Sequence, residues 1–355
     1  MAHDNAATRH PEQCGHASRF KSTPNNEIPQ NSSRTMNEAA GNGAPQSPRS
    51  VEALPQNIPS IQPGGGVCMS CELAWGHVRR AYLRWLRPGY VRRMAELRRG
   101  SDIGYPHAIL DPRDLKFCRN QGDLGWDAGD DPFAWRDRLP VARVGLAEIT
   151  ILGGGFLILA ALCLWLFWPL AVVPLVLAGF VVYFFRNPRR DVPAQPGAVV
   201  SPADGRIFSI RDVDHDDYLG GPAVVIDIFL SVFNVHLNRV PMECRIMGLT
   251  YRPGKFLNAL RPEAAQQNAS LEVRLATTSQ PVRAFRVRQI TGAIARRIVC
   301  WVKPGEDLPR GGQFGMIKLG SRTELTLPRE AGMEVCVRVG QNVRAGVTVM
   351  VQYSR

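Results

Sequence analysis

The hydrophobic and polar positions divide the chain into four stretches. Residues 1–66 are rich in Asn, Ser, Pro, Gly and Gln and nearly lack aromatic side chains, which predicts a disordered extension. Residues 67–140 are basic with a partly helical pattern, and residues 141–188 are strongly apolar. Residues 189–355 carry the short apolar runs typical of β-strands. No apolar core follows the first Met, so a secretory signal is not expected.

The basic stretch contains a segment, residues 72–99, in which Trp, Tyr and Leu are interleaved with arginines. This pattern predicts a basic amphipathic helix that breaks near Pro88–Gly89. Such a helix can lie on an anionic membrane, or it can pack on the folded domain with its charges in solvent. The sequence leaves both alternatives open.

The apolar stretch contains 37 residues without a charge, from Ile149 to Phe185. As one helix they would be roughly 55 Å long, against a bilayer core of about 30 Å. Pro169 and Pro174 divide the run, so the pattern favours a membrane anchor of two helices forming a hairpin. A shallow re-entrant anchor is the first alternative, and a buried pair of soluble helices is the second.

Arginines flank the apolar run on both sides. They are Arg136, Arg138 and Arg143 before it and Arg186, Arg189 and Arg190 after it. Because basic residues stay on the cytoplasmic side, both ends are expected there. The sequence therefore predicts a protein of the cell membrane whose folded domain lies on the cytoplasmic face.

The C-terminal stretch predicts one compact domain that is mainly β (α+β). Short runs rich in Val and Ile alternate with turns of Gly, Pro and Asp, and no long helical period interrupts them. The expected strands are Ala223–Leu230, Val282–Ile290, Arg297–Val302, Glu334–Val339 and Val347–Gln352. Gln341–Gly346 is expected to be a hairpin-type connection between two short strands.

The charge favours an anionic partner. The formal net charge is +12, and 38 of the 43 basic residues are Arg, whose planar guanidinium binds phosphate and carboxylate in a bidentate way. No aromatic–basic stacking motif or helix-turn-helix pattern appears, so a membrane surface is favoured and nucleic acid is not expected. Eight Cys without regular spacing indicate a reducing compartment.

Two residues of the β stretch are candidates for proton transfer. His236 lies in an apolar run beside Asn234 and Asn238, and only His titrates near neutrality without help. Asp204 precedes Gly205, where an Asp is usually a turn residue. Taken alone, each has an ordinary structural interpretation.

Two further groups contain metal-ligand residue types. Cys68 and Cys71 stand three residues apart with His77 nearby, and an acidic cluster spans Asp212–Asp217. Neither group has the spacing of a known site, so no metal is predicted.

The Gly320-Ser321 pair has a specific chemical potential. Gly leaves its carbonyl unhindered and tolerates unusual backbone angles, and the following Ser carries a hydroxyl that can attack that carbonyl. With a base to accept the proton, an ester replaces the amide. Most Gly-Ser pairs are nevertheless ordinary turns.

Taken together, the motifs of residues 139–355 resemble the bacterial phosphatidylserine decarboxylase family in its shorter form. The order and co-occurrence of several modest motifs carry this resemblance. They are Phe184–Pro188, Ser201–Gly205, Phe229–Arg239, Gly254–Ala259, Gln289–Val299 and Phe314–Arg322.

The resemblance implies a self-processing proenzyme. Ser321 would attack the Gly320 carbonyl, and elimination would leave a pyruvoyl group derived from Ser321 as the cofactor. The chain would divide into a large β subunit, residues 1–320, and a small α subunit, residues 321–355. The pyruvoyl carbonyl would form a Schiff base with membrane phosphatidylserine, which would lose CO2 to give phosphatidylethanolamine.

The resemblance also assigns roles to the two candidate residues. His236 and Asp204 match the positions that work with Ser321 in a charge-relay arrangement. The chain departs from the family at Gln266–Ser270, where the family usually has an acidic stretch. The alternative to an enzyme is a non-catalytic, membrane-anchored β domain that binds lipid headgroups.

Overall fold

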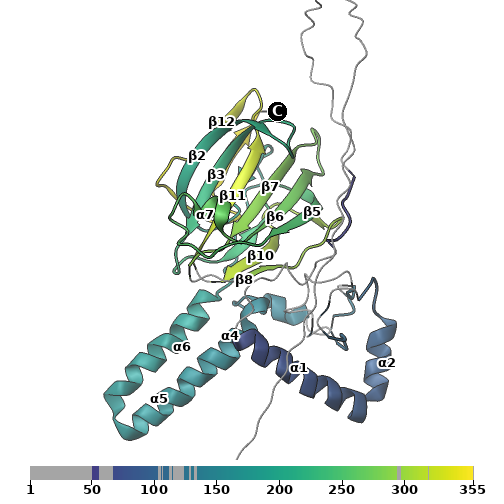
Figure 1. The fold of residues 1–355 in the computed structure, drawn as a ribbon, viewed down its shortest axis with the longest axis vertical. Coiled ribbons are helices and arrows are strands. Elements are labelled where there is room, and N and C mark those ends of the chain that lie inside the picture. The colour runs from purple at the N-terminus through teal and green to yellow at the C-terminus, as the bar shows by residue number, and fades with distance from the viewer. Residues whose placement is uncertain are drawn as a thin grey trace, which may run out of the picture. The chain divides into compact units, whose positions relative to one another are not determined.

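The computed structural model describes residues 50–55 and 67–354, apart from residues 103–104, 106, 112–113, 115–123, 128, 132–133, 294–296 and 319. Except for residues 50–55, the predicted disordered extension lies outside the described residues. In the described residues the named elements between Val67 and Phe184 are all helices, and those from Ala198 onward are mainly β-strands (Figure 1). This division agrees with the hydrophobic pattern of the sequence.

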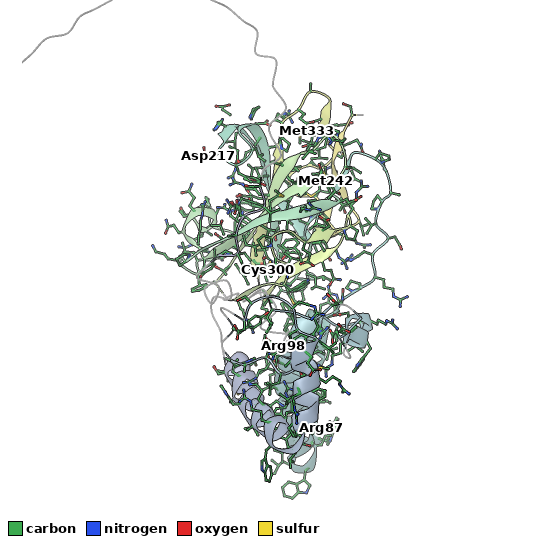
Figure 2. The ribbon with its side chains drawn as sticks, turned by 90° about the vertical axis from the view of Figure 1, so that its right-hand side faces the viewer. Arg87, Arg98, Asp217, Met242, Cys300 and Met333 are labelled. Atoms are coloured by element: carbon green, nitrogen blue, oxygen red, sulfur yellow. The ribbon has the colours of Figure 1, made fainter. Side chains whose placement is uncertain are left out.

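The basic segment forms two helices. α1 (Val67–Leu86) and α2 (Pro88–Glu96) are separated at Arg87, where Pro88 occupies the first position of the second helix. The predicted break near Pro88–Gly89 is thereby confirmed, since proline can begin a helix but cannot continue one. Beyond α2 lies Arg98, labelled in Figure 2. Its guanidinium donates to the Ile109 carbonyl at 2.6 Å.

The apolar run folds as a helical hairpin. Its two main helices, α5 and α6, lie side by side and are divided between Leu166 and Trp168 (Figure 1). The stretch Arg143–Leu166 is long and apolar enough to cross a bilayer, and Trp168–Phe184 is apolar but shorter. The helical segments of this region are η3 (Ala134–Arg138), η4 (Arg143–Gly145), α4 (Leu146–Glu148), the π-helical η5 (Ile149–Gly153), α5 (Gly154–Leu166), η6 (Trp168–Ala171) and α6 (Val172–Phe184).

The C-terminal domain consists of three sheets. In the described chain every pair of named strands is antiparallel. The strands are β1 (Ala198–Val200), β2 (Gly205–Asp216), β3 (Gly221–Leu230), β4 (Leu237–Arg239), β5 (Cys244–Arg252), β6 (Ser270–Thr277), β7 (Ala284–Ile290), β8 (Arg297–Cys300), β9 (Asp307–Leu308), β10 (Gln313–Lys318), β11 (Ser321–Pro328), β12 (Met333–Val335), β13 (Asn342–Val343) and β14 (Val349–Tyr353). One short helix, α7 (Ala264–Gln267), interrupts them.

The largest sheet has the order β13-β2-β3-β11-β7-β6-β5-β9, and the two smaller ones are β1-β14-β12 and β4-β10-β8. β11 lies between β3 and β7 in the middle of the large sheet (Figure 1). The predicted strands are confirmed, although β12 is shorter than expected. The connection from β12 to β14 differs from the expected simple turn, because β13 lies within it and pairs with β2.

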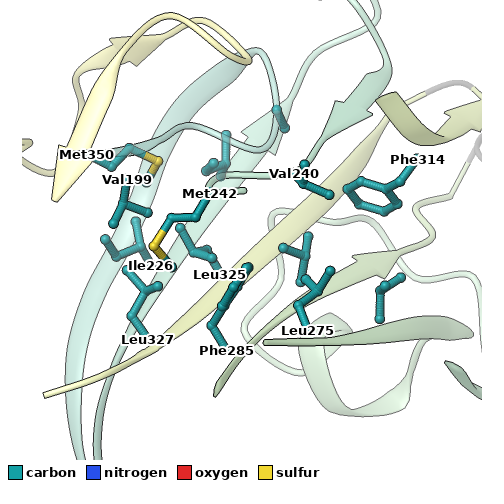
Figure 3. Close-up of a cluster of buried hydrophobic side chains, with 14 of the residues drawn as sticks. Val199, Ile226, Val240, Met242, Leu275, Phe285, Phe314, Leu325, Leu327 and Met350 are labelled. Atoms are coloured by element: carbon teal, nitrogen blue, oxygen red, sulfur yellow. The ribbon is translucent and has the colours of Figure 1, made fainter. Parts of the chain in front are cut away.

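One hydrophobic core joins the three sheets (Figure 3). Phe285 of β7 and Leu325 of β11 come from the large sheet, Met350 of β14 from the second and Phe314 of β10 from the third. All four side chains are fully buried. Since burying a large apolar side chain contributes roughly 1.5–3 kcal/mol, this shared core stabilises the packing of the three sheets on one another.

A smaller cluster attaches the helical hairpin to the β domain. Ala142 before the hairpin and Phe184 and Phe185 at its end pack against Leu237 of β4 and Met316 of β10. The Ala142 N–H also donates to the Phe185 carbonyl at 2.7 Å. Both ends of the hairpin are therefore fixed next to the strands that surround the candidate site.

Candidate active site

Ser321 begins β11 in the interior of the large sheet. It lies opposite Leu230 of β3, and the next residue, Arg322, lies opposite Ile290 of β7. The Ser321 side chain is fully buried, and in the described part of the chain its Oγ has no hydrogen-bond partner. An unpaired buried hydroxyl is costly, and a role in chemistry is one explanation for keeping it.

Gly320 has a backbone that favours glycine. Its φ is +61°, in the left-handed region that other residues rarely adopt. Leu319, just before it, lies outside the described residues. The turn lets the chain pass from β10 to β11, which belong to different sheets.

His236 contacts the Gly320-Ser321 segment directly. Its Nε2 accepts the N–H of Gly320 at 3.1 Å, and its Nδ1 lies 2.9 Å from the carbonyl oxygen of Asn234. Because a carbonyl can only accept, Nδ1 carries the proton and Nε2 is the basic nitrogen. The Asn234 side chain in turn accepts the Ser231 N–H at 2.8 Å, which holds this loop closed.

The pKa of His236 is lowered to about 4, chiefly by burial and also by the positive charge of Arg186, while the hydrogen bond to Asn234 acts in the opposite direction. The imidazole is therefore neutral at physiological pH, as a proton acceptor must be.

The end of the apolar hairpin supports the His236 loop. The ring of Phe184, the last residue of α6, lies 4.6 Å from the imidazole of His236 between centroids. Arg186 donates to the Phe233 carbonyl at 2.7 Å, and the Tyr183 hydroxyl donates to the same oxygen at 3.2 Å. The sequence did not indicate this contact between the hairpin and the site.

Gly292 is a site residue that sequence reasoning did not single out. A Cβ added there would lie 2.3 Å from the Gly320 carbonyl oxygen and 3.2 Å from the Gly320 carbonyl carbon. The carbonyl that Ser321 would attack thus occupies the space of a side chain at residue 292. Only its position in the motif Gln289–Val299 hinted at a role.

Asn268 is the second such residue, and it lies in the segment that departs from the family pattern. Its side chain is buried and makes two hydrogen bonds of 2.8 Å with the main chain of Leu257. It also donates to the Thr291 carbonyl at 2.7 Å. Asn268 therefore joins two loops and holds the residue next to Gly292.

Asp204 is not hydrogen-bonded to His236. Its Oδ1 accepts the Ala345 N–H at 2.7 Å, and its Oδ2 accepts from the Arg190 guanidinium at 2.7 Å. The turn that carries Asp204 reaches the His236 strand indirectly, because the Pro202 carbonyl accepts the Arg239 N–H at 2.9 Å. The structure thus brings His236, Gly320 and Ser321 together and leaves Asp204 in another set of contacts.

Other residues with reactive side chains make contacts away from the Ser321 hydroxyl. Lys318, near the Gly320-Ser321 bond, is buried against Glu148 and donates to the Val144 carbonyl at 3.1 Å. Burial lowers the Lys318 pKa to about 8. In the acidic cluster, Asp216 binds Arg286 and accepts the N–H of Leu219. Within the described ranges, no three His, Cys, Asp or Glu residues are grouped as metal ligands.

Two cavities adjoin the site. One of about 580 Å³ is lined by Ser231 and Asn234 from the His236 loop, together with Arg206, Phe208 and Leu260 among others. Another of about 410 Å³ lies against Leu237 and Arg239 of β4. Neither Ser321 nor His236 lines these two cavities; both side chains are fully buried, while Gly320 is half-buried.

Comparison with known proteins supplies the family. A family profile described as phosphatidylserine decarboxylase matches residues 177–351. A phosphatidylserine decarboxylase proenzyme of Rhodopirellula baltica is 52% identical over 241 residues, which cover 68% of this chain and 100% of that protein. The proenzyme of Carboxydothermus hydrogenoformans is 45% identical over 207 residues, covering 58% of this chain and 91% of the relative.

A more distant relative gives the same result. The phosphatidylserine decarboxylase proenzyme of Burkholderia vietnamiensis is 40% identical over 251 residues, covering 70% of this chain and 99% of its own. The family expected from the motifs is confirmed, and the chain belongs to the phosphatidylserine decarboxylase family.

Proposed function

We propose that this chain is a proenzyme that cleaves itself between Gly320 and Ser321 and then converts phosphatidylserine to phosphatidylethanolamine and CO2. One observation carries the proposal: the basic nitrogen of His236 is hydrogen-bonded to Gly320, beside a buried Ser321 hydroxyl without a partner. The names of the relatives support the same activity.

Self-cleavage uses residues of the chain itself. The Ser321 Oγ attacks the Gly320 carbonyl carbon and gives up its proton to His236, so that an ester replaces the amide and the Ser321 nitrogen becomes an amine. Removal of the Ser321 Cα proton then expels the Gly320 carboxylate and leaves a dehydroalanine. Water replaces the nitrogen, ammonia leaves, and residue 321 ends as a pyruvoyl group.

The surroundings of Ser321 fit this group. Its hydroxyl has no competing hydrogen bond to break, and the glycine at 292 leaves room for the carbonyl that must change geometry. The pyruvoyl group supplies an electron sink for the charge left when CO2 departs. Loss of the bond to Gly320 would also free residue 321, which is fully buried in the intact chain, to meet the substrate.

The two products of cleavage would stay together. β11 belongs to the small fragment and pairs along its length with β3, from Ser321 opposite Leu230 to Pro328 opposite Ala223. It also pairs with β7 on its other side, and β14 pairs with β1. These contacts support an assembly of a β subunit, residues 1–320, and an α subunit, residues 321–355.

The helical hairpin supports a lipid substrate. The helical stretch Arg143–Leu166, whose charged residues Arg143 and Glu148 lie near its start, is long and apolar enough to cross a bilayer core of about 30 Å. Since Phe184 of α6 packs on His236, anchoring α6 in the membrane would hold the reactive residues at the membrane surface. The flanking arginines favour the cytoplasmic face of the cell membrane.

A denaturing gel followed by mass spectrometry tests the proposal. The enzyme should give a large fragment and a piece of about 4 kDa, roughly a tenth of the 39.3 kDa chain, whose first residue is pyruvoyl. Ser321→Ala should give an intact chain that releases no CO2 from phosphatidylserine. An active protein with an intact chain, or with an unmodified Ser at the start of the small fragment, would refute the mechanism. An intact and inactive wild-type chain would favour the non-catalytic lipid-binding alternative.

A further inference from the structure

α1 packs on the protein through its polar side. Gly76, Arg80 and Leu83 are buried on one face of the helix. Arg80 lies 3.5 Å from the Asp114 carboxylate, and its guanidinium covers the position where Gly76 lacks a side chain. An ion pair therefore holds this face of α1 in place together with the apolar contacts of Leu83.

A second arginine strengthens the same attachment. Arg79 pairs with Asp111 and, at 2.5 Å, with Asp114, and both carboxylates are buried. Asp114 also accepts the Leu110 N–H at 3.1 Å. Buried, hydrogen-bonded ion pairs of this kind fix the rotation of a helix about its axis, because breaking one leaves an uncompensated charge.

Most of the large apolar side chains of α1 point away from this attachment, although Leu83 is buried in it. Six of them are exposed, and at 100° per residue they project from an arc of about 100°. They are Val67, Trp75, Val78, Tyr82, Trp85 and Leu86, with Trp75 65% and Trp85 81% exposed. A helix on a soluble domain normally buries such a stripe, so this arrangement is inverted.

The composition of the stripe indicates what covers it. Trp and Tyr have an apolar body with a polar edge and gather at the lipid–water boundary. Arg84 and Arg87 are exposed at the C-terminal end of α1, and Arg92 and Arg93 are exposed on α2. These cations complement anionic lipid headgroups. α1 also contacts α4, which leads directly into the apolar hairpin.

We propose that the exposed stripe of α1 docks in the lipid–water interface of an anionic bilayer, as a second membrane contact beside the hairpin. This inference rests on the proposed function in one respect: an enzyme that acts on phosphatidylserine must reach a membrane. It also combines the two alternatives left by the sequence: α1 packs on the protein with one face, through Asp111 and Asp114, and binds lipid with another.

Tryptophan quenching in the full chain tests the docking. The protein is reconstituted into vesicles of phosphatidylcholine and phosphatidylglycerol with bromine on the phosphatidylcholine acyl chains. The difference between the tryptophan emission of the wild-type chain and that of the double variant Trp75→Phe/Trp85→Phe is the signal of the two α1 tryptophans. In the same way, Trp165→Phe yields the signal of a hairpin tryptophan. Trp301→Phe yields the signal of a control tryptophan in the β domain, whose indole N–H donates to the Gln313 carbonyl. Self-cleavage of each variant reports that it folds.

The Trp75/Trp85 signal should shift to the blue and be quenched by brominated lipid, more strongly when phosphatidylglycerol is present, and the Trp301 signal should not be quenched. If the Trp165 signal is quenched and the Trp75/Trp85 signal is not, the docking of α1 is refuted and the anchor stands. If neither is quenched, both membrane contacts are refuted, while self-cleavage and CO2 release still report on the enzyme separately. A blue-shifted but unquenched Trp75/Trp85 signal would mean that protein covers the stripe, which also overturns the proposal.

Discussion

The imidazole of His236 accepts the main-chain N–H of Gly320 through Nε2 at 3.1 Å, at the residue whose carbonyl precedes Ser321. Its other nitrogen is committed to the Asn234 carbonyl, which leaves Nε2 as the basic atom. The lone pair that holds the Gly320 N–H is thus next to the peptide bond that we propose is broken. To accept the Ser321 proton, Nε2 must exchange one hydrogen bond for another.

Replacing His236 separates its chemical role from its structural one. His236→Gln keeps a side chain that can accept the Gly320 N–H but cannot act as a base. We expect both His236→Gln and His236→Ala to accumulate the intact chain, with cleavage slowed on the order of 10²–10⁴-fold. Band intensities on a denaturing gel over time measure the rate. Normal cleavage in His236→Gln would refute the base assignment.

The pH profile of self-cleavage should reflect the buried imidazole. Because burial lowers the His236 pKa to about 4, the neutral form persists well below the ordinary value of about 6.5. We expect the rate to stay level down to about pH 5 and to fall as the pH approaches 4. A fall centred near 6.5 would show that the group responsible is solvated.

The same shift predicts the direction of a stability change. Below about pH 6.5 the unfolded chain binds a proton at His236 that the folded chain does not bind, so stability falls until the pH reaches the folded pKa of about 4. When the pH is lowered from neutral to 4.5, the melting temperature of the uncleaved Ser321→Ala chain should therefore fall by more than that of the Ser321→Ala/His236→Gln chain. Equal losses would contradict burial of a neutral imidazole.

Asp204→Asn tests the charge relay that the family resemblance implies. We expect strongly slowed cleavage in this variant. Since Asp204 binds Arg190 and not His236 in the intact chain, Arg190→Gln is the matched control. If Asp204 acts electrostatically on His236, only Asp204→Asn should slow cleavage at unchanged melting temperature. Equal slowing and equal destabilisation in both variants would assign Asp204 to the Arg190 pair instead.

Gly292→Ala should impair cleavage by displacing the reacting carbonyl. The added methyl would lie 2.3 Å from the Gly320 oxygen, so the carbonyl must move. A displacement near 1 Å can cost about 10²-fold in rate. Gly221→Ala, where a Cβ meets nothing within 4 Å, should cleave normally. Normal cleavage in Gly292→Ala would mean that the carbonyl position is not critical.

Asn268→Asp should weaken the loops around the site. The substitution keeps the shape but removes the donors to the Leu257 and Thr291 carbonyls. Each lost buried hydrogen bond costs about 1–3 kcal/mol, so we expect a lower melting temperature and slower cleavage. Gln266→Ala, at an exposed position of the same segment, should change neither. An unaffected Asn268→Asp chain would show that the two loops are held by other contacts.

Local patterns of the sequence were sufficient for several features. The uncharged run predicted the helical hairpin, because only internally hydrogen-bonded helices satisfy the backbone of so long an apolar segment. Alternating Val and Ile predicted the strands, and Pro88 marked the break between α1 and α2. Adjacent residues indicated the chemical potential of Gly320-Ser321, but its role as a cleavage site came from the family resemblance of motifs across residues 139–355. For the hairpin, the strands and the helix break, the relevant interactions lie within a few residues along the chain.

The composition of the site depended on contacts between distant segments. Strand periodicity tells which residues share a face, but not which strand lies next to which, so the position of β11 between β3 and β7 came only from the structure. The same holds for Gly292 against the Gly320 carbonyl and for Asn268 between two loops.

The sequence by itself determined the chemical groups of this protein: an apolar hairpin, a β domain, a Gly-Ser pair and a histidine. The tertiary structure alone decided that His236 meets Gly320 while Asp204 binds Arg190, and that the polar face of α1 is the buried one. The physical reason is that hydrogen bonds and ion pairs act over a few ångströms. Which partners come that close depends on how the sheets and loops pack, which no local pattern encodes.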